Sequence, residues 1–141
     1  MTNASLTGLR IVLVLAGAII IFTGINIAFG GMQTLGWQGE ALFFEVTNEH
    51  AFLVHDSHFR FLGGLWLGVG ALFIVASTNL RKYRSALIFA FALIFFGGIA
   101  RFSQMLFEIL FGPEILGSLL AELVGMPLLY LWLSKAVSAA E

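Results

Sequence analysis

The sequence contains no cysteine and few charged residues, and each absence narrows the range of possible functions. Without cysteine, the chain can form no disulfide, thiolate metal site or iron–sulfur cluster, and it has no cysteine nucleophile. Charged residues make up 11% of the 141 residues, whereas a soluble domain usually carries about 25%. So small a charged fraction provides too little polar surface for a water-exposed globule. The formal net charge of −1 gives no reason to expect nucleic acid as a partner.

What the sequence does contain is long apolar runs, and hydrophobic residues account for 60% of it. A helix needs about 20 apolar residues to cross the hydrocarbon core of a bilayer. Backbone polar groups cannot stay unpaired in lipid, so such runs are expected to be helical. We predict an all-α bundle of four transmembrane helices, over residues 9–29, 61–80, 85–107 and 115–134.

The first apolar run follows Arg10 and could be mistaken for a signal peptide. It is too long for a typical signal h-region, and no A-x-A-like site follows it, so we expect a retained helix. The chain has only two prolines and shows no low-complexity tract or repeat. We therefore predict a single integral membrane domain over residues 1–141.

Basic residues crowd the short connection between the second and third predicted helices, at Arg81, Lys82 and Arg84. The positive-inside rule places this connection in the cytoplasm. Arg10 and Lys135 then fall on the same side. The sequence thus predicts a multi-pass protein whose N- and C-termini are both cytoplasmic.

The stretch over residues 30–57 is the only sizeable part predicted to lie outside the bilayer. It is too long for a tight turn and too apolar for a solvated linker. We expect a capping loop that folds back onto the outer surface. A short hairpin turning at Asn48 and Glu49 and an interfacial helix are both compatible with its sequence.

Ionisable side chains inside spanning helices usually face the bundle interior or a cavity. With a rise of 1.5 Å per residue, Arg101 lies roughly 25 Å across the membrane from Arg84, and Glu122 roughly 20 Å across from Lys135. Asn26 and Arg60 reach the same outer half of the bilayer. We therefore predict a buried polar cluster built on these residues. Helical spacing adds Gln104 and Glu108 on the face of Arg101, and Ser118 on the face of Glu122.

Two further features of the spans bear on packing. Gly64 and Gly68 have the small-xxx-small spacing that lets helices approach closely. Pro127 is expected to kink the fourth helix and to free the carbonyl near Leu123.

Three roles are open for the polar cluster. Arg101 and Glu122 can form a structural ion pair that fixes helix register. Arg60 and Arg101 can bind a polar or anionic ligand. Glu122 can take part in proton- or ion-coupled transport.

Three histidines lie close together in the predicted outer loop: His50, His55 and His58, with Asp56 among them. Imidazole and carboxylate are suitable zinc or copper ligands, but this spacing matches no established metal motif, so these residues are weak candidates and we predict no metal. The predicted spans contain no histidine, and we expect no haem or other cofactor.

Several segments resemble a known family: DSHFRF at 56–61, LGGLWLGVG at 62–70, GGIARFS at 97–103 and ELVGMPLL at 122–129. Together they look like the family known as domain of unknown function 4345, over nearly the whole chain. The resemblance implies a small bacterial four-helix protein of the inner membrane. It draws attention to Arg60, Arg101 and Glu122, and it implies no particular activity.

The leading hypothesis is a non-enzymatic integral membrane protein that binds a lipid, a hydrophobic or anionic metabolite, or a partner membrane protein. The sequence has no nucleophile elbow, P-loop, dinucleotide fingerprint or HExxH motif. A proton-coupled small-molecule carrier that uses Glu122, acting as a homo-oligomer, is an alternative. A membrane enzyme of lipid or quinone chemistry, with Arg101 and Glu122 as electrostatic and acid–base groups, is another.

Overall fold

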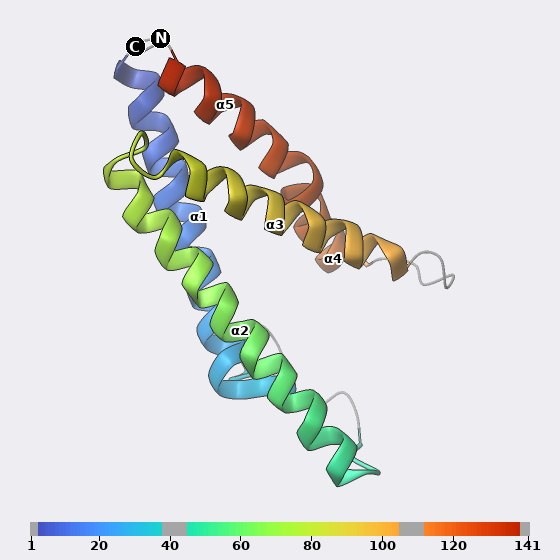
Figure 1. Ribbon diagram of the computed structural model, residues 1–141. Coiled ribbons are helices and arrows are strands. Elements are labelled where there is room, and N and C mark those ends of the chain that lie inside the picture. The colour runs from blue at the N-terminus through green and yellow to red at the C-terminus, as the bar shows by residue number, and fades with distance from the viewer. Residues whose placement is uncertain (1–2, 38–44, 105–111, 139–141) are drawn as a thin grey trace. The chain divides into compact units, whose positions relative to one another are not determined.

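The computed structural model describes residues 3–37, 45–104 and 112–138, and every regular element in these ranges is helical (Figure 1). Four helical segments of the described chain are long and apolar enough to cross a membrane. The predicted all-α fold with four spans is therefore confirmed. The elements are α1 (Asn3–Gly30), η1 (Gly31–Gln33), α2 (Glu49–Thr78), α3 (Arg84–Phe102), α4 (Pro113–Leu120), η3 (Ala121–Gly125) and α5 (Met126–Ser138).

The chain divides into two compact units. One, Val12–Ser77, contains most of α1 together with η1 and α2, and we call it the hairpin unit. The other joins Met1–Ile11 to Thr78–Glu141 and contains the start of α1 with α3, α4, η3 and α5; we call it the terminal unit. Each unit is described by itself, and the single domain over residues 1–141 stays a prediction.

The second span begins much earlier than predicted, at Glu49 rather than near Phe61. Asn48 caps it, because its side-chain Oδ1 accepts the Ala51 N–H at 3.0 Å. Thirty residues at 1.5 Å each give a helix of about 45 Å, longer than the hydrocarbon core of about 30 Å. The helix therefore continues past the apolar run, and the predicted hairpin at Asn48 and Glu49 is wrong. The residues after Glu49 are helical, but as part of α2 and not as a separate interfacial helix.

The first part of the predicted capping loop does fold back onto α1. The Leu35 N–H donates to Asn26 Oδ1 at 2.7 Å. The ring of Trp37 stacks on Phe22 with centroids 5.2 Å apart. Residues 38–44 of this loop lie outside the described residues.

The two helices of the hairpin unit approach closely at glycines, though not at the predicted ones. A Cβ atom at Gly17 would lie 2.8 Å from the Gly70 carbonyl oxygen, and one at Gly70 would meet the Gly17 carbonyl oxygen at 2.8 Å. At Gly63 a Cβ would overlap the α1 backbone. A Cβ at Gly64 or Gly68 would meet no described atom within 4 Å. The predicted contact at these two positions is wrong for the packing of α1 against α2.

In the terminal unit, α3 packs against the fourth span, which consists of α4, η3 and α5. Its buried residues recur at helical spacing: Leu119, Glu122, Met126, Leu129 and Leu133. The span is interrupted at Ala121–Gly125, where one turn is π-helical. Pro127 follows at once and removes a backbone N–H. The irregularity expected around Leu123 therefore takes the form of a π turn.

Candidate ligand-binding site

The terminal unit contains the predicted pair of Arg101 and Glu122. Arg101 Nε donates to Glu122 Oε2 at 3.2 Å, and Arg101 Nη2 donates to Glu122 Oε1 at 3.0 Å. The pair is therefore bidentate, with both carboxylate oxygens bonded to the one guanidinium. It fixes the orientation of the arginine as well as its position.

Local structure explains how the two side chains meet. Glu122 is the second residue of the π turn η3, a feature that is frequent at functional sites. On the facing helix, a Cβ at Gly98 would lie 2.8 Å from the Glu122 Cβ. The missing side chain at Gly98 thus lets η3 approach α3 one turn before Arg101. The contact with Glu122 explains why position 98 is a glycine.

The two partners differ in exposure. The Glu122 side chain is 10% exposed and the Arg101 side chain is 42% exposed. Both carboxylate oxygens face Arg101, whereas a guanidinium has five N–H donors, of which two point to Glu122. Among the described residues, Arg101 has hydrogen bonds only to Glu122, and the rest of its guanidinium is at the exposed side of the pair.

Arg60 was predicted to join this cluster, but its described partners are in the hairpin unit. Arg60 Nε donates to Asp56 Oδ2 at 2.6 Å, and Arg60 Nη1 donates to the Phe29 carbonyl at 2.6 Å. Asp56 Oδ1 in turn accepts the Met32 N–H at 2.8 Å. The pair fastens the end of α1 to α2. Convergence of Arg60 with Arg101 stays a prediction.

Sequence analysis missed Asp56 as the partner of Arg60. The two residues are spaced i, i+4, which is the spacing of helical ion pairs. That signal was present, but the segment was taken for a loop, where the spacing carries no such meaning.

The other predicted cluster residues have separate surroundings. Asn26 is fully buried, and its Oδ1 accepts the Leu35 N–H, as described above. The Ser118 hydroxyl donates to the Ile115 carbonyl of its own helix at 2.8 Å. Gln104 is exposed, two residues beyond the end of α3. Glu108, like the predicted end of the third helix near Phe107, lies outside the described residues.

The histidines of the first turns of α2 are exposed at positions 50, 55 and 58. Asp56, which was considered with them, is occupied by Met32 and Arg60. The described residues contain no group of three or more histidine, aspartate or glutamate side chains placed to hold a metal ion.

Comparison with known proteins gives one match. The family model described as Domain of unknown function (DUF4345) matches residues 8–133. No curated protein matches the chain, and no solved structure does. The match extends from the first span to the fourth and includes both arginine–carboxylate pairs. The chain belongs to the DUF4345 family.

Proposed function

We propose that this protein is a non-enzymatic multi-pass membrane protein that binds an anionic amphiphile through Arg101. The carrying observation is the geometry of the Arg101–Glu122 pair. One edge of the guanidinium is fixed by a buried carboxylate, and the other edge is exposed at the end of a membrane-spanning helix. A lipid phosphate or the carboxylate of a hydrophobic metabolite has the charge and the acceptor oxygens that this edge requires.

The exposed surface of the spans supports an amphiphile rather than a fully polar anion. Many large apolar side chains of the described spans are exposed, and Phe102, next to Arg101 in the sequence, is 51% exposed. A ligand held at Arg101 therefore lies beside apolar surface, which suits an acyl or isoprenoid tail better than a fully hydrated anion.

The geometry favours binding over a proton-coupled carrier. Both oxygens of Glu122 accept hydrogen bonds from Arg101. A carrier cycle that loads a proton on Glu122 would have to open this pair in every turnover. A binding site, in contrast, uses the pair as it stands.

The binding test uses the purified protein in zwitterionic detergent with oleate and phosphatidylglycerol as probes, measured by native mass spectrometry. Arg101→Gln is expected to weaken binding about tenfold or more, as the loss of a hydrogen bond to a charged group implies. Arg60→Gln is the matched control, because it removes the same charge from a pair of similar exposure. Equal binding by wild type and Arg101→Gln would overturn the proposal.

Arg101→Gln leaves Glu122 without its cation, and a loss of binding in this variant can come from misfolding. A second variant separates the two causes. Arg101→Lys keeps the charge beside Glu122 but removes the planar fork. It is expected to fold and still to bind the probes severalfold more weakly. If Arg101→Lys binds like wild type, then the fixed guanidinium edge is not the binding element.

We place the protein in the bacterial inner membrane with both termini in the cytoplasm. The support is the basic connection at Arg81, Lys82 and Arg84. The chain has no cysteine, so single cysteines report orientation cleanly. Ser85→Cys is expected to react with a membrane-impermeant maleimide only after permeabilisation, and Thr47→Cys in intact cells. The reverse labelling would invert the orientation.

A further inference from the structure

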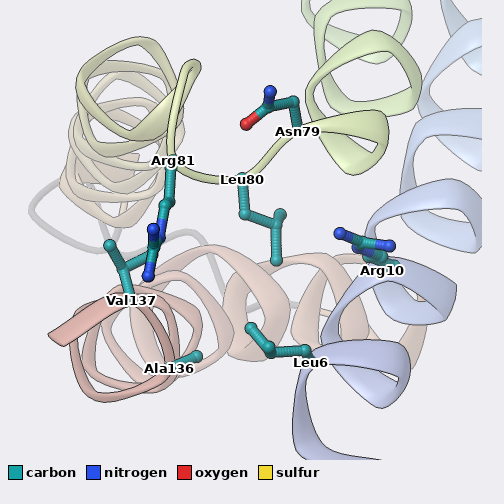
Figure 2. Close-up of a pocket in the computed structure, with 7 residues that line it drawn as sticks. All are labelled: Leu6, Arg10, Asn79, Leu80, Arg81, Ala136 and Val137. Carbon is teal, nitrogen blue, oxygen red and sulfur yellow. The ribbon is translucent and has the colours of Figure 1, made fainter. Parts of the chain in front are cut away.

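The terminal unit contains a pocket beside the connection between α2 and α3 (Figure 2). Its volume is about 210 Å³. Three segments distant in sequence form it: the first turns of α1, the connection between α2 and α3, and the last turns of α5. The lining residues are Leu6, Arg10, Asn79, Leu80, Arg81, Ala136 and Val137.

The connection that carries Arg81 is held in a fixed turn. Asn79 Oδ1 accepts the Lys82 N–H at 3.0 Å, and the Asn79 carbonyl accepts the Tyr83 N–H at 3.1 Å. Leu80 is buried at 3% exposure and anchors the turn to the unit. Arg81 therefore lies in a turn that is closed by the hydrogen bonds from Lys82 and Tyr83 to Asn79.

The start of α1 is held against α5 by a half-buried tryptophan. Trp132 Nε1 donates to the Ser5 hydroxyl at 2.9 Å. A Cβ at Gly8 would lie 3.3 Å from the Trp132 ring. Arg10, two residues farther along the same helix, is thereby placed at the pocket. Figure 2 shows Arg10 and Arg81 on either side of Leu80, with Leu6 and Ala136 below.

Among the described residues around the pocket, the charged side chains are all basic. Five of the seven basic residues of the chain lie at this end: Arg10, Arg81, Lys82, Arg84 and Lys135. The described residues of the terminal unit next to the pocket, at 4–11, 78–85 and 132–138, include no acidic residue. Such a concentration of positive charge attracts phosphate groups.

We propose that this pocket binds the phosphate group of an anionic phospholipid from the cytoplasmic leaflet. Arg10 and Arg81 would hold the phosphate, and Leu6 would contact the apolar part of the lipid. The volume is below the roughly 300–1,000 Å³ of typical small-molecule sites, so it suits a head group whose chains remain in the bilayer. The pocket and Arg101 lie at opposite ends of α3, about 25 Å apart along a helix with 1.5 Å rise per residue.

The experiment measures phosphatidylglycerol binding to the full chain in phosphatidylcholine nanodiscs, at about 1 M salt, where screening reduces the Debye length to about 3 Å. Arg10→Gln and Arg81→Gln are each expected to weaken binding about tenfold, since each removes a charged hydrogen bond. Arg84→Gln is the matched control, because it removes the same charge from the same connection without lining the pocket. It is expected to change binding less than about twofold at this salt concentration.

Equal losses in Arg81→Gln and Arg84→Gln would show diffuse attraction and overturn the pocket. No loss in either pocket variant would overturn it as well. Inorganic phosphate and glycerol phosphate are tested as competitors. If they bind as tightly as the lipid, the site takes a soluble phosphate ester, and the lipid assignment is wrong. The binding is measured in the Arg101→Gln background, which leaves this pocket intact, so that phosphatidylglycerol bound at Arg101 does not contribute and the two binding proposals fail independently.

Discussion

The hairpin unit and the terminal unit each contain one arginine–carboxylate pair, and the pairs are nearly alike in exposure. The arginine side chain is 45% exposed at Arg60 and 42% at Arg101, and the carboxylate side chains are 12% and 10% exposed. They differ in their other partners. The pair in the hairpin unit also bonds the main chain of α1 and η1, at Phe29 and Met32. For Arg101 and Glu122, the described residues provide only each other.

The additional partners of Arg60 indicate that the two arginine–carboxylate pairs have different roles. At the end of α1, carbonyl groups without helical partners need donors, and Arg60 supplies one from α2. Its guanidinium is thereby part of the fold. Arg101 satisfies no main-chain group of the described chain, and in our proposal its outer edge binds the ligand. Composition and exposure alone would have assigned both arginines the same role.

The largest expected effect concerns the backbone beneath the hairpin pair. Gly31 has φ of +65°, and a Cβ there would overlap the carboxylate of Asp56. Gly31→Ala is expected to lower the free energy of unfolding by roughly 3 kcal/mol, from the left-handed backbone and a displaced charged hydrogen bond. Denaturant unfolding in mixed micelles, followed by circular dichroism, measures it.

Gly64→Ala is the control for this variant in the same unit. A Cβ there meets no described atom within 4 Å, and alanine favours a helix. We expect unchanged or slightly raised stability. If the two alanine variants lose equal stability, the Asp56 contact does not hold the end of α1.

The second prediction exchanges each arginine for lysine, which keeps the charge but not the fork. Arg60→Lys is expected to lower the free energy of unfolding by about 1.5 kcal/mol, because one ammonium cannot replace the bonds to both Asp56 and Phe29. Arg101→Lys is expected to lower it by less than about 1 kcal/mol, because Glu122 keeps a cation. The opposite order in the same unfolding assay would reverse the roles assigned to the two pairs.

Sequence patterns located the membrane-embedded parts better than the ends of the helices. Apolar runs report the hydrocarbon core, so they marked the second span from Phe61. They are silent on the turns of α2 that extend beyond the core, where Asn48 provides the cap. Because the start of α2 was predicted as a loop, the i, i+4 spacing of Asp56 and Arg60 did not indicate a helical ion pair.

The Arg101–Glu122 pair was predictable, because depth along two helices depends only on residue counts and a fixed rise. Choosing between Gly63 and Gly64 as the contact with α1 was not. Adjacent residues differ by about 100° in facing direction, and a glycine pair gives no indication of which one faces the partner. The pocket was not predictable either, since Arg10 and Arg81 line it from segments far apart in the sequence.

The smallest expected effect is a loss of unfolding free energy in two tryptophan variants. It tests whether the difference between Arg60 and Arg101 comes from the ion pairs themselves or from a difference in stability between the two units. Each unit has a tryptophan that donates to a hydroxyl on α1: Trp66 to Thr23 Oγ1 at 3.0 Å, and Trp132 to Ser5 Oγ at 2.9 Å. Trp66→Phe and Trp132→Phe remove one neutral hydrogen bond each, worth about 1 kcal/mol. Equal losses of unfolding free energy mean that neither unit is simply the weaker one. A much larger loss from Trp66→Phe would attribute the sensitivity of Arg60 to the hairpin unit as a whole, and the contrast between the two ion pairs would then disappear.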